Sequence, residues 1–257
     1  MGETVSSDTG REAGESARLA WIDRSPLTLC LGSLAIAVVA GLVQVSFGSY
    51  SVSVAEAWRA VVDTTVLLDP RWLLNFLLGE QLMRSVLGFQ GDLPDLPTMT
   101  LIVWNVRLPR VFVVMIVGMN LAVSGAIFQA VTRNELASPF ILGVSSGAGL
   151  LVLLTLVVFP MLASALPVIA AAGIVGFVGL IVPHVVRNVV GSGYKRLVVG
   201  CLFAGPALLV AADVGARLAT PVLVGGSGQL PVGIVTGLVG GPYFLYLMRK
   251  QDQLGEI

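Results

Sequence analysis

The most constraining feature of this chain is an uncharged stretch of fifty-one residues between Glu135 and Arg187, in which His184 is the single titratable side chain. A water-soluble protein must cover its surface with polar side chains, and so long an apolar stretch supplies too few of them. A helix needs about 20 apolar residues to cross a bilayer. The stretch therefore has room for two membrane spans by itself, and it predicts a multi-pass membrane protein.

The composition of the whole chain agrees with this prediction. Hydrophobic residues make up 56%, charged residues 12%, and the mean hydropathy is +0.91, whereas ordinary globular domains are roughly 25% charged. The formal net charge is zero, which gives no indication of a nucleic-acid partner and leaves the lipid bilayer as the expected surroundings. Cys30 and Cys201 lie inside apolar runs, which is typical of small buried residues rather than of disulfides or metal ligands.

The expected fold is all-α, a polytopic transmembrane helical bundle of about six spans. Ser138 followed by Pro139 is typical of a helix start and sets the beginning of the third span. The predicted spans are 26–47, 108–131, 139–159, 167–186, 197–216 and 230–248.

The distribution of positive charge predicts the orientation of these spans. With the N-terminus inside, nine Lys and Arg residues fall on the cytoplasmic side and six on the outer side, so both chain ends are expected in the cytoplasm. Residues 1–25 and 251–257 would then be cytoplasmic polar tails, and 26–250 the transmembrane domain, with one large outer segment at 48–106. Within that segment, 71–87 is predicted to lie along the membrane interface as an amphipathic helix, with Trp72 and Phe76 at headgroup level. A re-entrant segment is the alternative.

The predicted second span carries small and polar side chains among its apolar ones. Gly118, Ala122 and Ala126 recur every fourth residue and predict a helix face that a neighbouring helix can approach closely. Polar side chains are costly when they face lipid, so those of this span are expected to point to the protein interior or to a water-filled path. Hydrogen bonds between helices without a role in transport explain them equally well. With the small residues that follow, the candidate pathway or helix-packing residues are Asn120, Ser124, Gln129, Ser145, Ser146 and Gly147.

Three arginines, Arg107, Arg110 and Arg217, lie at the predicted outer ends of spans. Long cationic side chains at such positions can extend to the lipid headgroups. The alternative is a ring of outward-facing cations that docks an acidic partner. Asp213 precedes Arg217 by four residues, a spacing that predicts an ion pair along one helix.

The sequence gives no indication of catalysis. It lacks the G-x-x-x-x-G-K-[ST] loop that binds nucleotide phosphates, and it has one histidine and two cysteines. We therefore expect no catalytic residues, no metal site and no cofactor in this chain.

Several ordered segments resemble the FecCD-type permeases of ABC importers for iron–siderophore, haem and vitamin B12. They are IVWNVRLPR (102–110), LAVSGAIFQAVTRNELASPFILGVSSGAG (121–149), GFVGLIVPHVVR (176–187), AADVGAR (211–217) and LPVGIVTGLVGGPYFLYLMRK (230–250). The resemblance implies a cell-membrane permease, active as a homodimer with its path between two copies. It also implies cytoplasmic ABC ATPase subunits that hydrolyse ATP and an extracytoplasmic solute-binding protein. In that family, outer arginines pair with glutamates of the binding protein, and the matching positions here are Arg107, Arg110 and Arg217.

The chain departs from this family in its middle. Members usually have about ten spans, and about twenty-five residues (150–175) replace several spans and the cytoplasmic loop that contacts the ATPase. The sequence thus predicts a shortened permease subunit. A non-transporting remnant, acting as a membrane scaffold or regulatory partner, is the alternative. An independent secondary transporter or channel is a weaker possibility, because Asp213 is its one candidate acidic residue within a span. The residues do not select among iron–siderophore, haem and cobalamin.

Overall fold

The computed structural model describes residues 24–46, 53–78, 96–139, 143–158, 175–223 and 230–255, and all regular structure in these ranges is helical. The elements are α2 (Arg24–Ser46), α3 (Val54–Val61), α4 (Thr64–Leu68), α5 (Pro70–Leu78), α7 (Thr98–Ile102), the π-helical turn η1 (Val103–Arg107), α8 (Leu108–Thr132), α9 (Val144–Val158), α11 (Val178–Val190), α12 (Tyr194–Leu223) and α13 (Val232–Gly255). The predicted all-α fold is confirmed.

Four helical segments in the described ranges are long and apolar enough to cross a membrane: Ser25–Ser46, Thr98–Thr132, Tyr194–Thr220 and Val232–Arg249. The second is continuous through α7, η1 and α8. Helices α9 and α11 have 15 and 13 residues, fewer than the roughly 20 that a span needs. The polytopic helical fold is thus confirmed, while the count of six spans and the cytoplasmic location of both ends remain predictions.

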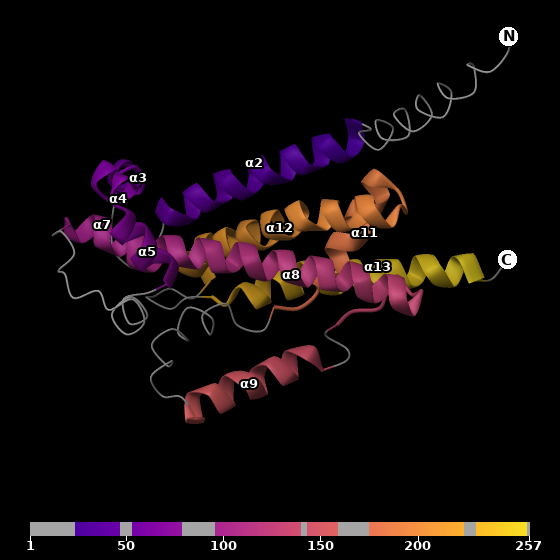
Figure 1. Ribbon diagram of the computed structural model, residues 1–257. Helices are drawn as coiled ribbons and strands as arrows, with labels where there is room; N and C mark the ends of the chain where they lie inside the picture. The colour runs from indigo at the N-terminus through magenta and orange to yellow at the C-terminus, as the bar shows by residue number, and fades with distance from the viewer. Residues whose placement is uncertain are drawn as a thin grey trace, which may run out of the picture.

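Helix α12 is the centre of the bundle, and it packs along α8 and α2 and against α11 and α13 (Figure 1). The α8–α12 contact is close because both helices present glycine. A Cβ added to Gly118 would lie 2.5 Å from the carbonyl oxygen of Gly205, and Ala122 and Ala126 on the same face are fully buried. The predicted small-residue face is confirmed, and it brings two backbones into van der Waals contact as is typical of helices packed in lipid.

A second close approach joins α8 to α11. A Cβ on Gly125 would overlap the carbonyl of Gly179, and one on Gly179 would lie 2.9 Å from the carbonyl oxygen of Leu121. Residue Phe177, at φ 66°, directly precedes α11. This left-handed conformation is rare for an aromatic residue, and Gly240 of α13 leaves the space that the Phe177 side chain occupies.

The short helices between α2 and α8 fold onto the C-terminal end of α2 and the N-terminal end of α8. Helix α3 begins with a capping box, in which Ser53 Oγ accepts from the amide of Glu56 and the Glu56 carboxylate accepts from the amide of Ser53. The indole of Trp104 donates to the carbonyl of Ala60 over 2.9 Å. The short helices therefore enclose an apolar cluster, which consists of Val45, Ala57, Ala60, Val66, Trp72, Val103, Trp104 and Val111.

Trp72 and Phe76 pack against the protein itself, and their position at headgroup level remains a prediction. Both lie on α5, where Trp72 is 5% exposed inside this cluster, and the Phe76 ring packs edge-on against Trp104 at 5.4 Å and Phe112 at 5.6 Å. Residues 79–87 of the predicted helix lie outside the described ranges.

Three predicted boundaries also change. The third predicted span starts at Val144 instead of Pro139, because Pro139 sits in a turn against Gly179 and Gly143 takes φ +77° just before the helix. Helix α11 begins at Val178, whereas 167 was predicted, and 159–174 are outside the described residues. Helix α13 continues to Gly255, so the predicted tail at 251–257 begins inside a helix. The predicted tail at 1–25 lies almost entirely outside the described residues.

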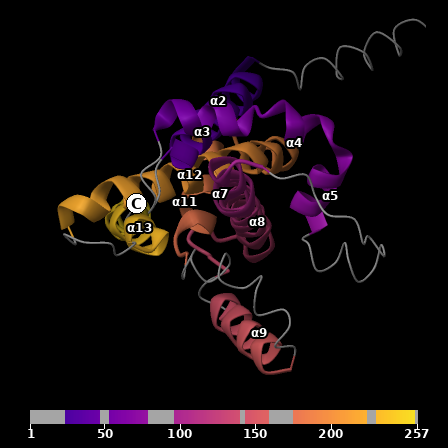
Figure 2. The ribbon, with the colours of Figure 1, turned by 90° about the vertical axis from the view of Figure 1, so that its left-hand side faces the viewer.

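Helix α9 differs from the other long helices in its surroundings. Figure 1 and Figure 2, which view the molecule from two directions, both show α9 apart from the bundle of α8, α11, α12 and α13. Leu150, Leu151, Leu153, Leu154, Val157 and Val158 on this helix are exposed. The predicted third span is therefore present as a helix, but one that packs little against the other helices that the structure describes.

Candidate functional site

The carboxylate of Asp213 on α12 is the most buried charge in the described structure, with its side chain 1% exposed. Its Oδ1 accepts from Arg110 Nη2 of α8 over 3.0 Å, and its Oδ2 accepts from Arg217 Nε over 3.0 Å. Gln44 Nε2 of α2 donates to Oδ2 over 2.6 Å. One carboxylate thus joins three membrane spans. We call Gln44, Arg110, Asp213 and Arg217 the outer cluster, after the side of the membrane on which the sequence predicts it.

Part of the outer cluster follows from the sequence. The Asp213–Arg217 pair, predicted from its spacing of four residues, is confirmed. The partnership of Asp213 with Arg110 was not predicted, since 103 residues separate the two. Gln44 was missed although a signal existed: it is a polar residue inside an otherwise apolar span, which usually indicates an interior position.

Arg107 occupies a different environment from the other two candidate arginines. The residue is 7% exposed, and its Nη1 donates to the carbonyl oxygens of Val45 at 2.6 Å and Ser46 at 3.4 Å. These are carbonyls at the end of α2, which have no partner within the helix. Arg107 therefore caps the C-terminal end of α2.

Arg110 and Arg217 keep partial access to the outside of the protein. Their side chains are 14% and 17% exposed, while the carboxylate between them is covered. Two guanidiniums fixed on one buried carboxylate form a rigid cationic feature, because each arginine loses rotamer freedom when it binds Asp213.

The candidate pathway residues on α8 do not share one environment. Asn120 and Ser124 are exposed and bond to their own helix, Asn120 Nδ2 donating to Ile116 O over 2.9 Å and Ser124 Oγ to Leu121 O over 3.1 Å. Gln129 is 2% exposed. Within this chain, then, Gln129 alone of the three points to the interior, and Asn120 and Ser124 lie on an outward face of α8.

The remaining candidates are on α9. Gly147 is exposed, and a Cβ there would meet no atom within 4 Å. The side chains of Ser145 and Ser146 lie outside the described part of the chain.

A second polar cluster lies at the opposite ends of the helices and includes Gln129. Arg187 of α11 forms an ion pair with Glu135, which follows α8, and its Nη2 donates to Gln129 Oε1 over 3.4 Å. His184 Nδ1 lies 3.8 Å from Glu135 Oε2, and its ring packs edge-on against Tyr243 of α13 at 5.9 Å. We call Gln129, Glu135, His184 and Arg187 the inner cluster, after its predicted side of the membrane. It joins the turn after α8 to α11 and α13.

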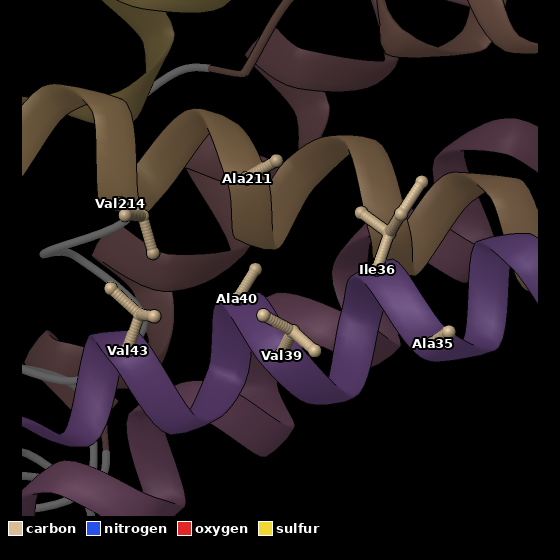
Figure 3. A pocket seen from close by; sticks show the side chains of 7 residues that line it. All are labelled: Ala35, Ile36, Val39, Ala40, Val43, Ala211 and Val214. Carbon is tan, nitrogen blue, oxygen red and sulfur yellow. The ribbon is translucent and has the colours of Figure 1, made fainter.

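An apolar groove of about 390 Å³ runs between α2 and α12 (Figure 3). It offers no charged or hydrogen-bonding side chain, so it has nothing with which to recognise a polar chelate. Its lining consists of Ala35, Ile36, Val39, Ala40, Val43, Ala211 and Val214. In the described residues no group of three or more His, Cys, Asp and Glu side chains could hold a metal ion.

Apolar spans that pack through glycine contacts, with charged side chains gathered at their ends, define an integral membrane protein of the multi-pass helical class. A family model described as the FecCD transport family matches residues 35–172 and 161–250. The chain belongs to this family, as its resemblance in five sequence segments predicted.

Several curated proteins are similar to parts of this chain. The hemin transport system permease protein HmuU of Yersinia pestis is 41% identical over 86 residues, covering 33% of this chain and 24% of the relative. The Fe(3+)-citrate import system permease protein YfmD of Bacillus subtilis is 38% identical over 144 residues, covering 56% and 40%. The chain thus spans less than half the length of these two relatives.

A more distant relative is matched nearly from end to end. The vitamin B12 import system permease protein BtuC of Escherichia coli O17:K52:H18 is 24% identical over 321 aligned residues, which cover 75% of this chain and 95% of the relative. Since this chain has 257 residues, the alignment leaves a long part of the relative without a counterpart. This agrees with a permease shortened internally. No solved structure matches the chain.

Proposed function

We propose that this chain is the membrane-spanning permease subunit of an ABC importer for iron–siderophore, haem or cobalamin-type chelates. The observation that carries the proposal is the family match, which runs from residue 35 to residue 250. The names of the relatives, permeases for hemin, ferric citrate and vitamin B12, indicate the substrate class. ATP hydrolysis would reside in a separate cytoplasmic ATPase subunit.

The translocation path is proposed to lie between two copies of the chain. Support comes from the exposed face of α8, on which Asn120 and Ser124 follow Ile116 at intervals of four residues. Polar side chains on the outside of a membrane helix are unfavourable against lipid. A second copy across a water-filled path would give them polar surroundings.

Docking of an extracytoplasmic binding protein is proposed at Arg107, Arg110 and Arg217. Arg110 and Arg217 would offer their partly exposed guanidiniums to carboxylates of the partner. Arg107, which caps α2, would hold the end of that helix beside the two docking arginines. Charge-assisted hydrogen bonds between guanidinium and carboxylate are strong and directional, so they suit recognition of an acidic surface.

The transport proposal is tested by reconstitution. The chain is placed in proteoliposomes with ATPase and binding-protein candidates encoded beside its gene, and uptake of ferric citrate, haemin and cyanocobalamin is measured with and without ATP. ATP-stimulated uptake of one probe is expected. A matched control replaces the phosphate-loop lysine of the ATPase by alanine, which must abolish the stimulation.

A second candidate function is a membrane scaffold or regulatory partner that does not transport. The long part of the BtuC relative that has no counterpart in this chain favours it, because the family resemblance places the ATPase-contacting loop in the missing middle. Stable co-purification with a binding protein but not with the ATPase, together with absent uptake, would support this function over transport.

A further inference from the structure

Within the outer cluster, Asp213 fixes the positions of the two partly exposed arginines, Arg110 and Arg217. Asp213 offers one oxygen to Arg110 and the other to Arg217, so the two guanidiniums are held on opposite oxygens of a single carboxylate. Arg110 comes from α8 and Arg217 from α12. Their separation is thus fixed by the carboxylate rather than by either helix alone.

Gln44 fixes this carboxylate in turn. Its Nε2 donates to Asp213 Oδ2 over 2.6 Å, while its own Oε1 is buried and has no hydrogen-bond partner in the described structure. Turning the amide over would bring Oε1 against the carboxylate oxygen, and two acceptors repel each other. The side chain therefore leaves one acceptor unsatisfied to keep its bond to Asp213.

The surroundings of α2 show why a fixing contact at this point matters. Near its N-terminal end, α2 packs against α12, where a Cβ on Gly200 would lie 3.5 Å from Leu29 Cδ2. Further along, the apolar groove lies between the two packed helices, and Figure 3 shows Val43 and Val214 facing each other across it. These are the sequence neighbours of Gln44 and Asp213, so the polar contact bridges α2 and α12 beside the groove.

We propose that Asp213 is a positioning residue for partner docking: with Gln44 it holds Arg110 and Arg217 in one fixed arrangement that matches a pair of carboxylates on the docking protein. The assignment rests on the proposed docking role of these two arginines. Two arginines with free rotamers would have to be ordered on binding, which weakens association. Asp213 orders them beforehand.

The test measures arginine reactivity in the full chain in lipid nanodiscs, with no partner present. Phenylglyoxal labelling is quantified by mass spectrometry at each arginine, in the unaltered protein and in Asp213→Asn. Labelling of Arg110 and Arg217 should rise roughly tenfold, the factor expected when a charge-assisted hydrogen bond is lost. Arg59, exposed on α3, and Arg107, held by α2 carbonyls, are internal controls and should not change.

A rise at Arg107 as large as at the other two would show a general loosening of the bundle and overturn the positioning role. So would a change of less than about twofold at Arg110 and Arg217. Should Asp213→Asn fail to fold, Gln44→Met keeps the charges and the volume, and it should raise labelling at the same two arginines by a smaller factor.

Binding measurements separate this inference from the docking proposal itself. With a binding protein that stimulates uptake, Asp213→Asn should weaken binding, and bound partner should protect Arg110 and Arg217 from phenylglyoxal. If Asp213→Asn alters the labelling but the bound partner does not protect Arg110 and Arg217, the docking role is excluded. Protection with binding unchanged by Asp213→Asn would leave docking in place and overturn the role of Asp213.

Discussion

The amide nitrogen of Gln44 lies 2.6 Å from the carboxylate of Asp213, which is 169 residues further along the chain. This contact brings the end of α2 to the part of α12 that also receives Arg110 from α8. Charged and polar side chains in membrane spans are rare and usually mark interior or functional positions.

Replacing Gln44 by an apolar residue should lower the free energy of unfolding slightly, and replacing it by a charged residue should lower it more. Gln44→Leu removes a hydrogen bond to Asp213 but also the unsatisfied Oε1, so we expect a loss of about 0.5–1 kcal/mol, the range of polar contacts in membrane bundles. Gln44→Glu places a second carboxylate beside Asp213 and should destabilise more. Thermal unfolding in detergent measures both. A Glu variant as stable as the Leu variant would contradict the contact.

The glycine contact between α8 and α12 should not tolerate a methyl group. A Cβ on Gly205 would overlap the carbonyl of Gly118 and lie 2.7 Å from Ala122 Cβ, so Gly205→Ala should cost about 1–3 kcal/mol through overpacking. The matched control is Gly237→Ala on α13, where a Cβ meets no atom within 4 Å. Unfolding midpoints should fall for the first variant alone.

Neutralising the two partly exposed arginines, Arg110 and Arg217, should weaken docking. Arg110→Gln and Arg217→Gln each remove a cation from the rim, and we expect about tenfold weaker binding of the binding protein per substitution. Arg59→Gln on α3 removes an exposed cation from the same predicted side and is the control. Surface plasmon resonance with the permease in nanodiscs measures the affinities. Equal affinities for all three variants would show that these arginines do not contact the partner.

The inner cluster should contribute little to stability through its ion pair. The Glu135 side chain is 49% exposed, and exposed ion pairs are worth about 0.5 kcal/mol because water and salt screen them. Glu135→Gln should therefore shift the unfolding free energy by about that amount, and less in high salt. A salt-independent loss several times larger would show that Glu135 has a further role.

The capping box of α3 should depend on pH. The hydrogen bond from the Ser53 side chain, followed by that from its backbone, holds the pKa of Glu56 below its ordinary value of 4.5. Because the folded pKa is lowered, the stabilisation is present above pH 4.5 and is lost as pH falls through the folded pKa. In Ser53→Ala the pKa should return toward 4.5. NMR titration of a ¹³C-labelled Glu56 side chain measures the shift, and identical titrations would exclude the box.

Much of the bundle was accessible to sequence reasoning because it depends on local properties. Apolar runs of about 20 residues predicted α2 (Arg24–Ser46) within about two residues of the expected bounds and the end of α8 at Thr132 within one. The helical segment that contains α8 begins earlier than expected, at Thr98. The boundaries near Pro139 and Val178 were wrong because turns there depend on contacts with Gly179 and Gly240, which lie on other helices.

The sequence by itself determined that lipid surrounds this protein, because its apolar segments are long enough to cross a bilayer. It also determined which residues share a helix face, because the 3.6-residue period places Gly118 beside Ala122 and Asp213 beside Arg217. Only the tertiary structure decided that Asp213 also receives Arg110 and Gln44, that Arg107 ends on the carbonyls of α2, and that Trp72 is buried. Those contacts join residues from different helices, and the packing of helices against one another, which no local period encodes, brings them together.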